Sequence, residues 1–322
     1  MLGRLLKVLV FSLGLLSAAQ AASPDGSFPT LREASNQALQ KQLEQRLKRL
    51  NLDAAVRDGR LAVALVDVTD PQHPRFAHVN GDDMVYAASL PKIAILLAAC
   101  ERIHEGKLKL DAETRQLMTD MIRYSSNTAA TEMIRRVGRN YINNLLSSPK
   151  YRLYDARYNG GLWVGKEYAQ GVAFQRDPLH NLSHGATAFQ VARFYYLLET
   201  GQLVSPELSK EMKAMLGDPG IKHKFVKGLL TDAPDAQIYR KSGTWRDWHA
   251  DSAIVEHAGR TYIAVALAQS PKGGEWLSKI ICELDGIIME QPVSTAALSA
   301  ERAAASRKSD ARPQSSSSER LM

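Results

Sequence analysis

An uninterrupted apolar run follows a lysine in the stretch YAASLPKIAILLAAC, residues 86–100. Residues 93–100 are all apolar, so a helix there has no polar face and is expected to be buried all round. Pro91 fits the first turn of such a helix, where a missing N–H costs nothing. The chain must therefore surround this helix completely, and Ser89 and Lys92 stand at its N-terminal end.

The two ends of the 322-residue chain are not expected to belong to the fold. Arg4 and Lys7 precede an apolar stretch and then small residues ending at Ala21, the pattern of a signal peptide spanning 1–21. A membrane anchor is disfavoured because the apolar stretch is too short to span a bilayer. Residues 292–322 are rich in Ser, Ala and Arg, which predicts a disordered tail. We therefore expect a periplasmic or secreted protein without stable membrane insertion.

Charge argues against a nucleic-acid partner. The chain has a formal net charge of +7. Setting aside the leader and the tail, which hold two and five basic residues and none and three acidic ones, leaves about +3. The remaining sequence has neither a dense Lys/Arg stripe nor a nucleic-acid-binding motif. We expect a monomer that acts on a small molecule or peptide.

Cysteine and histidine spacing gives no metal site. Cys100 and Cys282 each lie in an apolar helical run, so two buried free thiols are favoured over a disulfide. His180 and His184 are four residues apart, but no third ligand accompanies them, and we expect solvated loop histidines. No metal and no cofactor are predicted.

The order of elements predicts an α+β fold. Leucines at helical spacing in 31–50 are followed by two strands, the first at 60–70, and three further strands and a closing helix fill 236–290. The early and late strands would form one five-stranded antiparallel sheet flanked by the terminal helices. One domain, 22–291, is expected, with a sheet subdomain (about 30–88 and 215–291) around an inserted all-α subdomain (about 89–214). Residues 151–186 lose all periodicity and predict a long irregular loop of functional interest.

The pair Ser89 and Lys92 has a specific chemical use. Positions i and i+3 share a face of a helix, and both burial and the positive end of the helix dipole lower the pKa of a lysine there. A neutral amine beside a hydroxyl can act as general base for a nucleophile. The N–H groups at the same helix end, including that of Ser89, can stabilise an oxyanion.

The chain contains its own comparison for this motif. Ser147 and Lys150 form a second Ser-x-x-Lys match, again with proline before the lysine, but a polar segment rich in turn residues follows it. Nothing there would bury Lys150. Only the first match has the buried helix.

Two further motifs follow in order, each with an ordinary structural explanation. Ser125-Ser126-Asn127 could simply cap a helix, and Lys241-Ser242-Gly243-Thr244 could simply end a strand. Together, S-x-x-K, S-x-N and K-[ST]-G form the signature of class A β-lactamases and penicillin-binding proteins. The sequence resembles this β-lactamase and D,D-peptidase superfamily, and class A most closely, over nearly all of its central part.

The resemblance implies the following roles. Ser89 would be the acylated nucleophile, Lys92 its base, and Ser125 the proton relay to the departing nitrogen. Asn127 would bind the substrate side-chain amide, and Lys241, Gly243 and Thr244 the substrate carboxylate region. The N–H of Trp245 would complete the oxyanion hole.

The chain departs from the family pattern in three places. Ser126 replaces an aspartate, which predicts altered loop bracing, and Ser242 replaces a threonine. The usual Glu-Pro-x-x-Asn, which holds the deacylating water, is matched only by Asp177-Pro178-Leu179-His180-Asn181. Asp177 would either hold a water poorly, with Asn181, or simply start a turn. Glu167 is a weaker substitute.

Three functions stay open from the sequence. The first is an exported class A-type β-lactamase that hydrolyses the β-lactam amide. The second is a D-alanyl-D-alanine carboxypeptidase-type enzyme acting on peptidoglycan peptides. The third is a penicillin-binding module that is acylated and turns over little, because the deacylating glutamate is missing.

Overall fold

The computed structural model describes residues 28–291, and the predicted signal peptide and tail lie outside these residues. At its centre is one antiparallel sheet with the strand order β2-β1-β10-β9-β8. The five strands are β1 (Leu61–Asp67), β2 (Arg75–Val79), β8 (Gln237–Trp245), β9 (Trp248–His257) and β10 (Arg260–Gln269). The predicted five-stranded sheet, which joins early and late strands of the chain, is confirmed.

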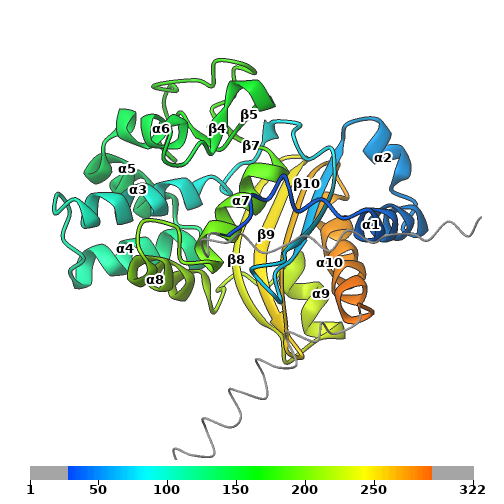
Figure 1. The fold of residues 1–322 in the computed structure, drawn as a ribbon. Helices are drawn as coiled ribbons and strands as arrows, with labels where there is room; N and C mark the ends of the chain where they lie inside the picture. Colours follow the sequence, from blue (N-terminus) through cyan, green and yellow to red (C-terminus); the bar gives the residue numbers. More distant parts are fainter. Residues whose placement is uncertain (1–27, 292–322) are drawn as a thin grey trace, which may run out of the picture.

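Helices cover both faces of this sheet (Figure 1). On one face lie α1 (Gln37–Arg49), α9 (Phe225–Asp232) and α10 (Gly273–Met289), and on the other lies α7 (Ala188–Glu199). Alternate residues of β1 point to opposite faces of the sheet and so belong to different cores. Val63 and Leu65 pack with the terminal helices, and Ala64 and Val66 pack in the core on the other face. Burial on both faces explains why this strand is apolar throughout.

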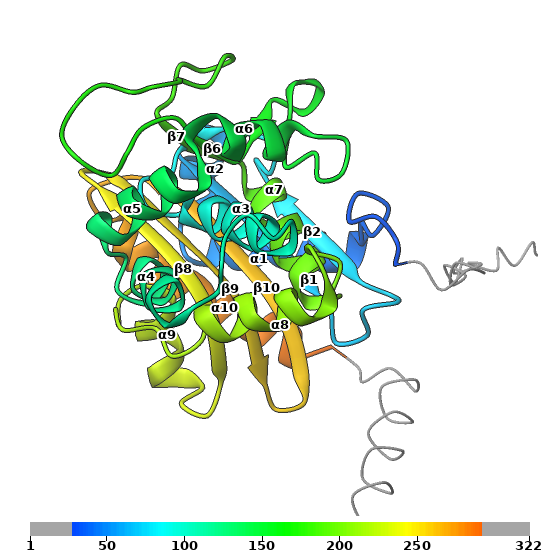
Figure 2. The ribbon, with the colours of Figure 1, turned by 90° about the vertical axis from the view of Figure 1, so that its left-hand side faces the viewer.

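The remaining helices form a block beside α7, which faces the viewer in Figure 2. They are α3 (Lys92–His104), α4 (Ala112–Arg123), α5 (Asn127–Val137), α6 (Arg139–Ser147) and α8 (Pro206–Leu216), while the short α2 (Asp53–Arg57) lies near α1. Every residue of α3 from Lys92 to Glu101 is buried. The predicted all-round burial of this helix is confirmed.

The irregular segment 151–186 contains more structure than its sequence predicts. It holds the two- and three-residue strands β4 (Tyr154–Asp155), β5 (Gly160–Gly161), β6 (Trp163–Val164) and β7 (His184–Ala186), and the short 3-10 helix η1 (Ala156–Tyr158). Strand β7 pairs with β3 (Val85–Tyr86), three residues before Ser89. Strands this short carry no readable periodicity, which is why they were not predicted.

The expectations for the cysteines and for two histidines can be compared with the structure. Cys100 and Cys282 are free thiols as predicted, although Cys282 is only half-buried. His180 is exposed as predicted, but the prediction for His184 was wrong, because this residue is buried in β7. Residues 28–291 contain no helix long and apolar enough to cross a membrane, and no group of three or more side chains placed to hold a metal ion.

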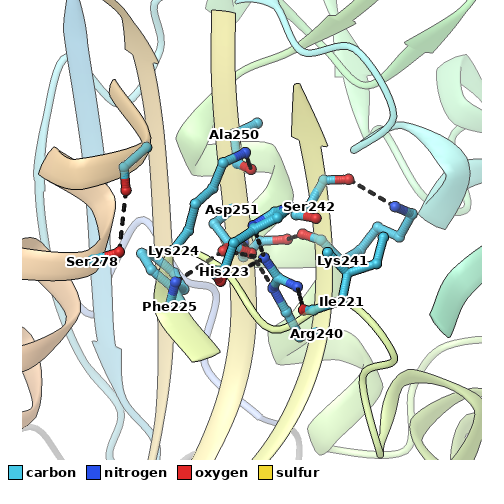
Figure 3. A network of polar contacts seen from close by, with 12 residues as sticks. Ile221, His223, Lys224, Phe225, Arg240, Lys241, Ser242, Ala250, Asp251 and Ser278 are labelled. Carbon is cyan, nitrogen blue, oxygen red and sulfur yellow. Dashed lines mark hydrogen bonds and ion pairs between the residues drawn. The ribbon is translucent and has the colours of Figure 1, made fainter. Parts of the chain in front are cut away.

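A buried ion pair joins two strands of the sheet to α9 (Figure 3). Arg240 on β8 donates from Nε and Nη2 to the two carboxylate oxygens of Asp251 on β9, at 2.7 Å each. The backbone N–H of Phe225, the first residue of α9, donates to Asp251 Oδ2 at 3.1 Å. The Asp251 side chain is fully buried, so this charge depends entirely on its partners.

Replacing Asp251 with Asn should therefore strongly destabilise the fold. The substitution leaves the Arg240 guanidinium buried without a counter-charge, which costs about 3–5 kcal/mol in comparable pairs. Urea unfolding followed by circular dichroism measures the loss. The control is Asp53→Asn, which breaks an exposed ion pair with Arg57 and should change stability little. Equal effects of the two variants would contradict the assigned importance of the buried pair.

Candidate active site

Strand β8 approaches the turn before α3 so closely that only glycine fits between them. A Cβ on Gly243 would lie 2.3 Å from the carbonyl oxygen of Ala87 and 2.8 Å from the backbone nitrogen of Ser89. Both are backbone atoms and cannot rotate away. Gly243 thus allows β8 to lie directly against the turn that carries Ser89, the predicted nucleophile.

The amine of Lys92 is enclosed by side chains and backbone from a different segment. Its Nζ donates to the carbonyl oxygen of Ser125 at 2.6 Å, to Asn127 Oδ1 at 2.8 Å and to Ser125 Oγ at 3.3 Å. Lys92 is 0% exposed, and this burial lowers its pKa to about 7. A substantial fraction of this amine is therefore neutral near neutral pH and able to accept a proton.

Ser125 occupies the short link between α4 and α5 in a strained backbone conformation. Its φ is +55°, in the left-handed region that is uncommon for residues other than glycine. The next residue, Ser126, caps α5 by accepting a hydrogen bond from the N–H of Ala129 at 3.1 Å. Ser126 thus acts as the helix cap that its position suggested, and the cap orients Ser125 and Asn127 toward Lys92.

A second lysine reaches the same hydroxyl from the sheet. Lys241 Nζ lies 2.9 Å from Ser125 Oγ and 2.7 Å from the carbonyl oxygen of Ser242. Burial and the neighbouring charge of Lys92 both hold the pKa of Lys241 well below its usual range. Ser125 therefore lies between two buried amines, where its hydroxyl can exchange protons with either.

The hairpin that follows Gly243 decides which backbone N–H faces the site. Trp245 pairs with Trp248 across a two-residue turn, so these two residues close the β8–β9 ladder and the N–H of Trp245 is used inside the hairpin. The N–H of Thr244 alternates to the free edge of β8. The register therefore favours Thr244 over the predicted Trp245 as the second oxyanion donor, beside Ser89. The Trp245 side chain is 55% exposed at the hairpin tip.

Two polar residues beside this edge were not predicted as part of the site. Lys224 Nζ donates to Thr244 Oγ1 at 2.8 Å and to the carbonyl oxygens of Gly243 and Ala250 at 2.5 and 3.1 Å. Figure 3 shows its side chain running toward Ala250. The hydroxyl of Ser242 makes no hydrogen bond within residues 28–291. Lys224 lies in a loop that contains no recognisable motif, so nothing in the sequence predicted its place at the site.

Asp177 and Asn181 do not join the enclosure around Lys92. Asp177 is 2% exposed, and its carboxylate accepts hydrogen bonds from the hydroxyl of Tyr154 and from the N–H groups of Leu179 and His180. These contacts brace the Asp-Pro turn, which was the second of the two roles considered for Asp177. Asn181 is exposed and has φ +56°, so it completes the same turn.

An aromatic ring also covers the amine of Lys92. The centroid of Tyr168 lies 4.4 Å from Lys92 Nζ, and no carboxylate hydrogen-bonds this amine within the part of the chain that the structure describes. The preceding residue, Glu167, instead pairs with Arg135 and Arg139, which lowers its pKa and makes it a poor base. Tyr168 was not predicted, since a tyrosine in an aperiodic segment carries no signal.

The second Ser-x-x-Lys match has none of these features. Ser147 is the last residue of α6, and the Lys150 side chain is 50% exposed and pairs with Glu101. The sequence favours Ser89 and Lys92 over Ser147 and Lys150, and the structure agrees, since Lys92 is buried and Lys150 is half exposed.

Comparisons with known proteins identify the family and the fold. Residues 42–115 and 111–289 match the sequence model described as the beta-lactamase enzyme family. A search of curated proteins gives no match.

Solved structures share the fold at low sequence identity. A β-lactamase from Sphaerobacter thermophilus is 18% identical, with a TM-score of 0.58 over 75% of this chain and 98% of that one. PBP-A is 17% identical, with a TM-score of 0.60 over 82% of this chain and 100% of that one. A variant of the last common ancestor of Gram-negative class A β-lactamases is 20% identical, with a TM-score of 0.60 over 77% and 98%.

Replacing Gly243 with Ala should separate β8 from the Ser89 turn. The new methyl group overlaps backbone atoms, so the strand must shift, and overpacking of this kind costs about 1–3 kcal/mol. Thermal unfolding measures the loss. The control, Gly274→Ala, meets only His249 at ordinary contact distances near the start of α10 and should leave stability unchanged or slightly raised. A Gly243→Ala protein as stable as the wild type would show that the close approach is not required.

Proposed function

The chain belongs to the beta-lactamase enzyme family, and we propose that it is a serine hydrolase that opens the amide of a β-lactam through an acyl-enzyme on Ser89. The observation that carries this proposal is the enclosure of Lys92 by Ser125 and Asn127, with Lys241 on the same hydroxyl. It supports a class A-type reaction, in which a buried neutral amine activates the serine.

The first step is attack by Ser89. Its Oγ makes no hydrogen bond within residues 28–291, so it is free to approach a substrate carbonyl. Lys92 takes the hydroxyl proton, and the N–H groups of Ser89 and Thr244 stabilise the oxyanion that forms. Both donors are held by the contact between Gly243 and the turn, so little reorganisation is needed when charge develops.

The second step is breakage of the lactam C–N bond. The proton on Lys92 passes through the Ser125 hydroxyl to the departing nitrogen, which Lys241 favours by its position 2.9 Å from that hydroxyl. Loss of the proton returns Lys92 to the neutral form.

The substrate carboxylate would bind at the edge of β8. Lys241, Lys224 and Thr244 present two amines and a hydroxyl there, with Arg240 behind them, and Asp251 is the carboxylate buried among them. A bound carboxylate would stabilise the protonated forms of these two amines, and both β-lactams and the C-terminus of a peptide carry such a group. Asn127 would contact the substrate side-chain amide.

A second candidate is favoured by the missing carboxylate beside Lys92. A D-alanyl-D-alanine carboxypeptidase-type enzyme, or a penicillin-binding module, uses the same acylation residues without a fast route for releasing a β-lactam acyl group. One neighbour in fold, a mutant of PBP-A, was solved as its acyl-enzyme complex with penicillin G. Asp177, engaged in its turn, supplies no replacement base.

The setting of the reaction is also a proposal. The leader sequence supports export to the periplasm or beyond, where both β-lactams and peptidoglycan peptides are encountered. We propose that the protein acts there as a monomer, without a metal or cofactor.

A chromogenic cephalosporin should acylate Ser89 in the wild type. Colour development reports turnover, and intact-mass spectrometry reports any adduct that persists. Repeated turnover supports the β-lactamase, whereas a stable adduct supports the second candidate. The absence of both would contradict every β-lactam hypothesis.

The matched pair of variants uses the two Ser-x-x-Lys motifs. Ser89→Ala should abolish both signals because the nucleophile is lost. Ser147→Ala removes the equivalent hydroxyl from the exposed motif and should behave as the wild type.

Acylation should depend on the protonation of Lys92. The neutral amine is the active form and its pKa is lowered to about 7, so the acylation rate should rise as the pH passes through that value and then level off. Stopped-flow acylation by penicillin G, from about two pH units below to about two above, tests this. A rate that does not change over that range would show that Lys92 is not the base.

A further inference from the structure

Tyr168 covers the side of Lys92 that no hydrogen-bond partner occupies. We propose that its ring keeps water away from this amine, and that Tyr168 thereby sets how long an acyl group remains on Ser89. This inference rests on the proposed acylation of Ser89. Tyr168 is a positioning residue in this scheme, since it acts through Lys92 and takes no part in bond making.

The ring completes the enclosure of the amine. Ser125 and Asn127 supply the three hydrogen-bond acceptors of Lys92 Nζ, and the face of Tyr168 lies 4.4 Å from the same atom. Lys92 has no exposed surface as a result. The ring therefore blocks one approach by which a water molecule could lose a proton to Lys92.

A buried histidine supports the ring from behind. Tyr168 stacks on His184 with centroids 4.3 Å apart and planes 2° from parallel. His184 is 4% exposed, its Nδ1 has no partner within residues 28–291, and burial lowers its pKa to about 3, so the ring is neutral. Stacking on this buried neutral ring fixes the tilt of Tyr168.

The same two residues hold the backbone that precedes the nucleophile. The Tyr168 hydroxyl donates to the carbonyl oxygen of Ala88 at 3.1 Å, and the N–H of Ala87 donates to the carbonyl oxygen of His184 at 3.1 Å. Ala88 has φ +50°, a conformation that needs such support. Tyr168 thus contacts both the amine and the turn that carries Ser89.

An ion pair one residue away secures the segment. Glu167 accepts hydrogen bonds from Arg135 on α5 and Arg139 on α6, and its side chain is only 14% exposed. Two guanidinium groups on one carboxylate make a directional anchor between the loop and the helical block. Weakening this anchor should let Tyr168 move while leaving its ring intact.

The affected step is hydrolysis of the ester on Ser89. The oxygen of a water molecule attacks the ester carbonyl carbon while its proton moves to the neutral Lys92 amine. The tetrahedral intermediate then expels Ser89 Oγ, which recovers the proton from Lys92. The C–O bond to the serine breaks and a carboxylic acid leaves. With Tyr168 in place, water reaches Lys92 rarely, which slows the first of these transfers.

The test separates acylation from release. The wild type, Tyr168→Ala and Tyr168→Phe are labelled with a fluorescent penicillin, and loss of the label is followed by gel fluorescence and intact mass. Tyr168→Ala should release the acyl group at least about tenfold faster, since a positioned general base is worth about 10²- to 10⁴-fold. Acylation should change far less than release, and Tyr168→Phe, which keeps the ring but loses the hydrogen bond to Ala88, should release the acyl group far more slowly than Tyr168→Ala. Unchanged release in Tyr168→Ala would overturn the inference.

A second measurement does not depend on β-lactams. Acetylation of Lys92 above its pKa, followed by peptide mass spectrometry, reports access to the neutral amine, with the exposed Lys150 as internal standard. Labelling of Lys92 relative to Lys150 should rise about tenfold in Tyr168→Ala and stay constant in Tyr158→Ala, an exposed tyrosine elsewhere. If no variant forms an adduct but Lys92 labelling rises in Tyr168→Ala, the proposed function is contradicted, while the inference that Tyr168 limits access to Lys92 is supported. Unchanged labelling of Lys92 would contradict that inference.

Glu167→Gln covers the case in which Tyr168→Ala does not fold. It keeps the ring but weakens the anchor to Arg135 and Arg139. Both acyl release and Lys92 labelling should rise several-fold above the wild type. A Glu167→Gln protein indistinguishable from the wild type in both measurements would count against the anchored ring.

Discussion

One buried amine connects the layers of this protein at the site. Lys92 begins α3, takes its acceptors from the link between α4 and α5, and shares the Ser125 hydroxyl with Lys241 of β8. An amine in such a place loses its hydration, which must be replaced by short contacts from several directions. The apolar run 93–100 that follows Lys92, the strained Ser125 and the glycine at 243 each serve to bring those contacts within range.

Burial of several cations in one region has an electrostatic consequence. Lys92, Lys241 and Lys224 all have pKa values lowered by burial, and like charges nearby oppose protonation of Lys241 further. Amines that can accept a proton therefore lie where the carboxylate of a substrate is proposed to bind. A bound carboxylate would favour the charged forms of Lys241 and Lys224 at the edge of β8, while the Lys92 amine, deeper in the site, stays available as a base.

The sequence indicates the residues proposed for acylation better than the residues around them, for a physical reason. Ser89, Lys92 and Ser125 lie at or beside the ends of helices, Lys241 lies within β8, and the buried helix distinguishes Lys92 from Lys150. Tyr168 and Lys224 reach the site from loops, where contact with distant segments decides position and no periodicity exists. The sequence named Trp245 as an oxyanion donor, whereas the register of the two-residue hairpin, which decides which N–H groups face the free edge of β8, favours Thr244. His184 was misjudged because β7 has only three residues.

This division between rigid elements and loops bears on the two halves of the proposed reaction. Acylation uses groups on α3, β8 and the α4–α5 link, all held by backbone contacts that tolerate little change. Release depends on whether water reaches Lys92, and that side is formed by a loop held through Glu167 and Tyr168. A change of one or two loop residues could therefore alter the lifetime of the acyl-enzyme without disturbing its formation. In this proposal the same fold can either release the acyl group quickly or retain it. The difference depends on Tyr168, which contacts Lys92 and takes no part in the bonds that form and break.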